Sequence, residues 1–128
     1  MRIDSDNERL LEPGEVHAKR KILVVEDNEL NREILSSFLE EKFEVLIAKN
    51  GEEGLKILVE HYRELSVILL DICMPVCDGF EFLRRRNADR ILSTIPVIVM
   101  TGSNSQDAEL QCLDLGAVDF IPKPYNIK

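Results

Sequence analysis

The sequence has no tryptophan, and aromatic residues make up only 5% of its 128 residues, so aliphatic side chains must form most of any core. Its three cysteines, Cys73, Cys77 and Cys112, are an odd and sparse set, which argues against a disulfide framework. His61 could join Cys73 and Cys77 in a zinc site, but the two ligand pairs typical of such sites are missing. We therefore expect reduced thiols and a cytoplasmic location.

Long apolar runs are missing as well. No stretch approaches the roughly 20 apolar residues that cross a bilayer, and the N-terminus lacks the apolar core of a signal peptide. Lys and Arg number 16 against 24 Asp and Glu, which gives a formal net charge of −8. Such a surface repels phosphates, so we expect no direct binding to nucleic acid or to a membrane. The acidic excess fits a partner with a basic face, an acidic site for a cation, or solubility alone.

The chain divides into a polar start and one domain. Residues 1–20 are irregular and contain Pro13-Gly14, so we expect an N-terminal tail or linker there, with a short helix around 7–11. From Lys21 onward, residues 21–128, apolar runs alternate with helical patterns. Most of the runs consist almost only of Val, Ile and Leu, as in strands buried on both faces of a parallel sheet. They cover 22–25, 45–48, 67–70, 96–100 and 118–121.

Helices are expected between these runs. Apolar residues recur at helical spacing at Leu30, Ile34 and Phe38, Asn50 is a predicted helix N-cap, and Gly116 a predicted helix end. The pattern predicts an α/β domain with a doubly wound parallel five-stranded sheet and helices on both faces. After Pro124, where a fifth helix would be expected, the sequence has only four residues. We expect a C-terminally truncated domain, although residues 4–12 or a second copy could cover the face left open.

Chemically active side chains follow several of the predicted strands. In open α/β sheets, ligands bind beyond the carboxyl ends of the strands. Glu26 and Asp27 follow the first run, Asp71 the third, Thr101 the fourth and Lys123 the fifth. Crowded carboxylates require a proton or a cation, and an all-oxygen ligand set favours Mg²⁺. A carboxylate can also attack phosphorus to form an aspartyl phosphate, which an ammonium and a hydroxyl would stabilise.

Each of these residues alone has an ordinary explanation. An Asp after a strand is commonly a turn or helix cap, a lysine is commonly a solvated charge, and Glu26-Asp27 could be the acidic start of the next helix. Their joint arrangement at the ends of different strands favours a shared site. Nucleotide binding is disfavoured, because the glycine-rich motifs GxxxxGK[ST] and GxGxxG are both missing.

Four blocks of the sequence resemble the response-regulator receiver domains of two-component signalling. The resemblance covers about Lys21 to Tyr125, and the string Asp27-Asn28-x-x-Asn31-Arg32 is reminiscent of receivers attached to hybrid sensor kinases. It implies a flavodoxin-like sheet with strand order 2-1-3-4-5, and a signalling switch with no enzymatic activity beyond its own phosphorylation and dephosphorylation. The four blocks are ILVVEDN at 22–28, LLDICMP at 69–75 with Asp78-Gly79, VMTG at 99–102 and FIPKP at 120–124.

The resemblance also implies residue roles. Asp71 would accept a phosphoryl group from a histidine kinase or a histidine phosphotransfer protein. Asp27 would bind Mg²⁺ directly, Glu26 mainly through water, and the backbone carbonyl of Cys73 would be a further ligand. Thr101 and Lys123 would contact the phosphoryl group. The aromatic ring of Phe120 would turn inward when Thr101 moves, which would change a face that regulates a partner.

Two rival functions remain open at this point. A haloacid-dehalogenase-like phosphatase also forms an aspartyl phosphate, but it would need a second Asp at the position of Cys73 as its acid and base. A pseudo-receiver would be an interaction module that works without phosphate on the same fold. The presence of all five key residue types speaks against the pseudo-receiver.

Overall fold

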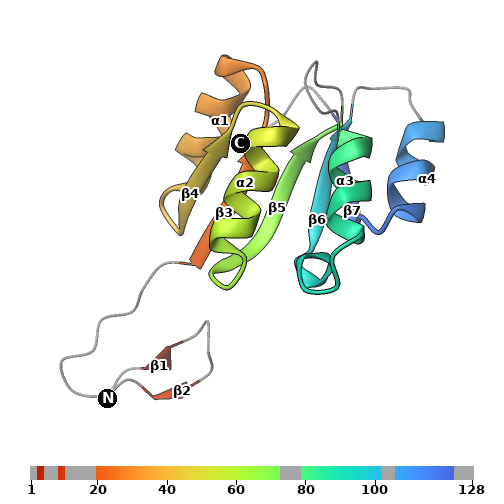
Figure 1. Cartoon of the computed structure of the whole chain (residues 1–128). Helices are drawn as coiled ribbons and strands as arrows, with labels where there is room; N and C mark the ends of the chain where they lie inside the picture. The colour runs from red at the N-terminus through yellow and green to blue at the C-terminus, as the bar shows by residue number, and fades with distance from the viewer. Residues whose placement is uncertain (1–2, 5–8, 11–19, 73–78, 102–105, 123–128) are drawn as a thin grey trace.

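The computed structural model describes residues 3–4, 9–10, 20–72, 79–101 and 106–122, and for 3–4, 9–10, 101, 106–109 and 122 it describes the backbone alone. The main sheet has five parallel strands in the order β4-β3-β5-β6-β7. Counted along the domain, this is the predicted order 2-1-3-4-5, and the doubly wound fold is confirmed (Figure 1). The strands are β3 (Arg20–Val25), β4 (Phe43–Ala48), β5 (Leu65–Asp71), β6 (Val97–Thr101) and β7 (Asp119–Pro122).

Four helices lie between these strands within the described residues. They are α1 (Glu29–Leu39), α2 (Gly51–His61), α3 (Gly79–Asn87) and α4 (Gln106–Asp114), with a 3₁₀ turn at Leu92–Thr94. None of the described helices has both the length and the apolar character needed to cross a bilayer.

The expected helix around residues 7–11 is wrong. Arg9–Leu10 (β2) pairs antiparallel with Ile3–Asp4 (β1) instead. The register sets Ile3 opposite Leu10 and Asp4 opposite Arg9, which matches an apolar residue with an apolar one and an acid with a base. An isolated helix of five residues is unstable in water, because its first turn orders several residues for a single hydrogen bond.

The two sheet faces carry separate cores, because successive strand residues point to opposite sides. Leu23 and Val25 of β3 belong to the larger core, which includes Leu58 of α2, Phe82 of α3 and Cys112 of α4. Figure 1 shows α2, α3 and α4 side by side on this face. Ile22 and Val24 of β3 point to the other face, where they form a smaller core with Leu35 of α1. Among the described helices, α1 alone packs on that second face, where Val67 and Ile98 are half-buried.

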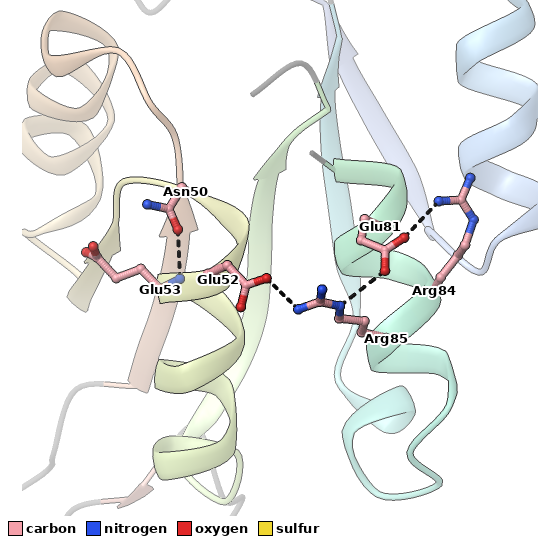
Figure 2. Close-up of polar contacts among 6 residues, drawn as sticks. All are labelled: Asn50, Glu52, Glu53, Glu81, Arg84 and Arg85. Atoms are coloured by element: carbon pink, nitrogen blue, oxygen red, sulfur yellow. Dashed lines mark hydrogen bonds and ion pairs between the residues drawn. The ribbon is translucent and has the colours of Figure 1, made fainter. Parts of the chain in front are cut away.

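Side-chain caps explain where the helices begin and end. Asn50 accepts a hydrogen bond from the backbone of Glu53 at 2.9 Å, as predicted, while the Glu53 carboxylate accepts one from the backbone of Lys49. Figure 2 shows this cap beside an ion-paired chain that joins α2 to α3: Glu52 contacts Arg85, which contacts Glu81. At the far end of α4, Gly116 adopts φ 98°, a conformation that favours glycine, and ends the helix as predicted.

A buried arginine, which sequence reasoning missed, ties the end of α3 to the segment that leads into β6. Arg86 in the last turn of α3 is only 3% exposed, and it donates to the backbone carbonyls of Ser93 and Ile95 at 2.8 Å. It also donates to the side chain of Asn87, whose amide donates to the carbonyl of Leu115 at the end of α4. Burial lowers the pKa of Arg86, because the charged guanidinium has lost much of its hydration.

Substitution of two closely packed glycines by alanine should destabilise the protein to different extents. A Cβ at Gly79 would lie 2.5 Å from the Cα of Ile72 and 2.9 Å from the carbonyl oxygen of Asp71, whereas at Gly54 it would meet only side-chain atoms of Val25 and Phe82. We expect Gly79→Ala to lower the free energy of unfolding by about 3 kcal/mol, because backbone atoms cannot yield easily. Gly54→Ala should cost less, about 1 kcal/mol, because its gain in helix propensity offsets part of the crowding against the buried Val25 and Phe82. Urea denaturation measures both, and equal losses would contradict the prediction.

Candidate metal centre

Three carboxylates meet at the carboxyl edge of the sheet. Glu26 and Asp27 directly follow β3, and Asp71 is the last residue of β5. The two strands pair in parallel with Val25 opposite Leu70, so Glu26, directly after β3, and Asp71, at the end of β5, lie side by side. Oxygen atoms of all three carboxylates lie within 4.8 Å of one another. The predicted clustering of these residues is therefore confirmed.

The three acids differ in exposure. Glu26 is 0% exposed and Asp71 1%, whereas Asp27 is open to solvent. Burying a carboxylate is costly unless hydrogen bonds or an opposite charge compensate it. The cluster is therefore open to solvent at Asp27, and its other two acids, Glu26 and Asp71, lie inside the protein.

The loop between β3 and α1 is held by polar contacts from the start of α1. The carboxylate oxygen Oε1 of Glu26 accepts hydrogen bonds from the backbone of Asn28 at 3.3 Å and from the side-chain amide of Asn31 at 3.0 Å. The guanidinium of Arg32 donates to the carbonyl oxygens of Glu26, at 3.0 Å, and of Asp27, at 2.8 Å. Asn28 is also the N-cap of α1, because its side chain accepts from the backbone of Asn31.

The donor set fits a small hard cation. Mg²⁺ binds oxygen ligands at about 2.1 Å, so two opposite ligands of one ion lie about 4.2 Å apart. The three carboxylates offer oxygens spaced by no more than 4.8 Å, which is close to that span. They are hard anionic oxygens, the ligand type that suits Mg²⁺ and Mn²⁺ better than it suits soft metals. Their chemistry therefore supports a divalent metal site.

The other predicted site residues are described only in part. Thr101 ends β6, one residue beyond the Met100 that pairs with Asp71, and its backbone pairs with Pro122 of β7. Phe120 of β7 is half-buried and packs against the larger core. Cys73 and Lys123 lie outside the described residues, so their roles, like the side-chain role of Thr101, stay predictions.

The main residues that sequence reasoning missed here are Asn31 and Arg32 as contacts of the acidic loop. They entered the sequence analysis only as part of a string that is reminiscent of receivers attached to hybrid sensor kinases. Their position in the first turn of a helix whose N-cap directly follows two acids was a usable signal. A side chain in the first helical turn can reach back to the residues that precede the helix.

The crowding of three acids predicts how the melting temperature of the metal-free protein changes when one of them is neutralised. Replacing Asp27 by Asn removes one of three neighbouring negative charges, so the melting temperature in EDTA should rise by about 3 °C. Glu41→Gln, which neutralises an exposed acid in the turn after α1, is the matched control and should change it little. A lower melting temperature for the Asp27 variant would show that the charges do not repel in the folded state.

Comparison with known proteins identifies the family. The family model for the response regulator receiver domain matches residues 22–128. The chain is 38% identical over 109 residues to a protein-glutamate methylesterase/protein-glutamine glutaminase of Bacillus licheniformis, covering 81% of this chain and 29% of that protein. It is 35% identical over 104 residues to the two-component response regulator ORR3 of Oryza sativa, covering 80% and 79%. The chain thus corresponds to less than a third of the first relative and to most of the second.

Solved receiver structures have the same fold. The receiver domain of Ssk1, crystallised with the histidine phosphotransfer protein Ypd1 of Saccharomyces cerevisiae, matches with a TM-score of 0.76 and 32% identity, covering 88% of this chain and 83% of that one. The Mn²⁺-bound response regulator Rcp1 matches with a TM-score of 0.74 and 27% identity, covering 84% of each chain. The receiver domain of a histidine kinase from Syntrophus aciditrophicus matches with a TM-score of 0.74 and 33% identity, covering 84% and 80%.

Receiver domains are switches in two-component signalling and not conventional enzymes. Three observations point to this class of protein: the order of the strands in the sheet, the cluster of three acids, and the match of the family model over residues 22–128. This chain belongs to the response regulator receiver domain family, and Glu26, Asp27 and Asp71 form the acidic pocket that is typical of the family's phosphorylation site.

Proposed function

We propose that this chain is a phosphorylatable signalling switch whose phosphoryl acceptor is Asp71. Receiver domains take their phosphoryl group from a kinase or a phosphotransfer protein, and we propose a histidine kinase or a histidine phosphotransfer protein as the donor here. The observation that carries the proposal is the position of Asp71: it ends a central strand, and its carboxylate lies within 4.8 Å of those of Glu26 and Asp27. The Ypd1–Ssk1 complex supports a phosphotransfer partner by analogy.

The transfer itself requires few groups. A carboxylate oxygen of Asp71 attacks the phosphorus of the donor phosphohistidine, the new P–O bond forms, and the P–N bond breaks with its electron pair going to the histidine nitrogen. Glu26, Asp27, Asp71 and the carbonyl of Cys73 are the proposed ligands of Mg²⁺. The bound ion would cancel negative charge where carboxylate and phosphoryl oxygens meet. The Mn²⁺-bound form of the related Rcp1 supports a divalent metal at such a site.

Two further groups are proposed to contact the phosphoryl group. The Lys123 ammonium would neutralise one of its oxygens, and the Thr101 hydroxyl would donate a hydrogen bond to another. Thr101 ends β6, the strand next to β5, and Lys123 directly follows Pro122, the last residue of β7, in the sequence. The proposal includes residues 1–20 as a tail or linker, a cytoplasmic location, and no direct contact with nucleic acid or membrane.

The proposed switch runs from Thr101 to Phe120. A phosphoryl dianion on Asp71 would draw the Thr101 hydroxyl toward it, the loop after β6 would shift, and the ring of Phe120 would fill the space. The two strands that carry these residues are hydrogen-bonded neighbours, with Val99 opposite Phe120. The face formed by α4 and β7 would then change for a regulated partner.

Phosphorylation is tested directly by intact mass. Incubation with acetyl phosphate and Mg²⁺ should add one phosphoryl group to the wild type and none to Asp71→Asn, because the amide is no nucleophile. Asp119→Asn, an exposed acid on β7, is the matched control and should still be modified. Omitting Mg²⁺ should slow the reaction strongly. Steady release of phosphate from many phosphate esters without a stable adduct would point to the phosphatase instead.

The switch makes a structural prediction. Structures with and without a phosphoryl mimic on Asp71 should differ in the positions of Thr101 and Phe120. Amide hydrogen exchange should change along β7 and α4 more than along β4 and α2, because the new charge acts through Thr101. Unmoved Thr101 and Phe120 side chains in the two structures would rule out the proposed route.

A further inference from the structure

The amide of Asn31 connects the first turn of α1 to a buried acid of the pocket. Its Nδ2 lies 3.0 Å from Oε1 of Glu26, while its own backbone N–H donates to the N-cap side chain of Asn28, also at 3.0 Å. The residue is therefore fixed through its backbone and is in contact with the pocket through its side chain. Because an ionised carboxylate only accepts hydrogen bonds, the amide must present its NH₂ group to Glu26.

Two donors converge on one oxygen of Glu26. Asn28, through its backbone N–H, and Asn31, through its side chain, both donate to Oε1. Two directional contacts on one oxygen restrict rotation of the carboxylate group and so define where its second oxygen lies. Since Glu26 is 0% exposed, water cannot replace the Asn31 donor without rearrangement of the pocket.

The neighbouring Arg32 keeps the backbone of this loop in place. Its Nη1 donates to two successive carbonyls, those of Glu26 and Asp27, and its backbone N–H donates to the carbonyl of Asn28. The backbone that carries the two acids is thereby attached to the same helical turn as Asn31. The geometry of the Asn31–Glu26 contact thus does not depend on a flexible loop.

We propose that Asn31 is a positioning residue which sets the affinity of the acidic pocket for its divalent cation by orienting Glu26. The inference rests on the proposed function, since it requires a cation at Glu26, Asp27 and Asp71. Asn31 belongs to the shell around the ligands, and its role is to hold Glu26 in one orientation before the cation arrives. Without this contact the carboxylate would sample several orientations, and part of the binding free energy would be lost in ordering it.

The expected effect is large enough to measure. Removing a residue that supports a metal ligand typically weakens metal binding by 10- to 100-fold. Because the family resemblance implies that Glu26 would bind the ion mainly through water, we expect the lower end of this range, about 10-fold, for Asn31→Leu. Leucine has nearly the shape of asparagine, lacks the donor, and keeps the backbone N–H that donates to Asn28. Asn31→Ala removes the same donor with a smaller side chain and should give the same direction.

The measurement is a titration of the ¹⁵N-labelled protein with MgCl₂, followed by the amide chemical shifts of residues 26–28 and 71. The same spectra report whether each variant is folded. Ser37→Ala, on an exposed position of the same helix, is the matched control and should bind Mg²⁺ as the wild type does. Each substitution is repeated in a Glu26→Ala background, which completes a double-mutant cycle.

The outcomes separate the two proposals. A 10-fold weaker affinity for Asn31→Leu that shrinks to less than 2-fold in the Glu26→Ala background supports the role of Asn31. An unchanged affinity overturns it, and so does an equal loss in both backgrounds, which would show a general structural effect. If the wild type shows neither Mg²⁺-dependent shifts at the pocket nor a phosphoryl adduct, the proposed function itself fails.

Discussion

The parallel pairing of β3 with β5 determines which side chains can meet at the carboxyl edge of the sheet. With Val25 opposite Leu70, the residues one position further along the two strands, Glu26 and Asp71, are both acids. A shift of this register by one residue would turn Asp71 to the other face of the sheet, away from Glu26. The register is maintained by apolar residues on both faces of β3 and β5, which are buried in two separate cores.

This arrangement holds negative charge where it is costly. Two of the three carboxylates are almost completely buried, and each lies within 4.8 Å of another acid. Polar contacts from Asn28, Asn31 and Arg32 keep the loop in this conformation. The first two residues donate to Glu26 through uncharged groups, and Arg32 donates to a backbone carbonyl. The pocket is therefore prepared for a positive charge by the fold itself, before any ligand is bound.

The fold and the acidic pocket could be predicted from the sequence because they depend on local and strongly periodic signals. Runs such as 22–25 and 67–70 have the composition of buried parallel strands, and one acid placed directly after each strand must lie at the same edge. The contacts of Arg86 could not be predicted, because they depend on a side-chain direction and on partners in another segment. The contact of Asn31 with Glu26 was missed although its place in the first turn of α1 was a usable signal. The short pairing of Ile3–Asp4 with Arg9–Leu10 was also missed, since a pattern over so few residues does not distinguish a helix from a strand.

Arg86 and Asn87 attach the end of α3 to the segments on either side of β6. Through Arg86 the helix end contacts the loop that enters β6, and through Asn87 it contacts the carbonyl of Leu115, just before the turn at Gly116. The C-terminal end of α4 is therefore anchored to a neighbouring helix, whereas its first residue follows the segment after β6. As long as the Asn87–Leu115 hydrogen bond is kept, a shift of the end of α3 carries the end of α4 with it.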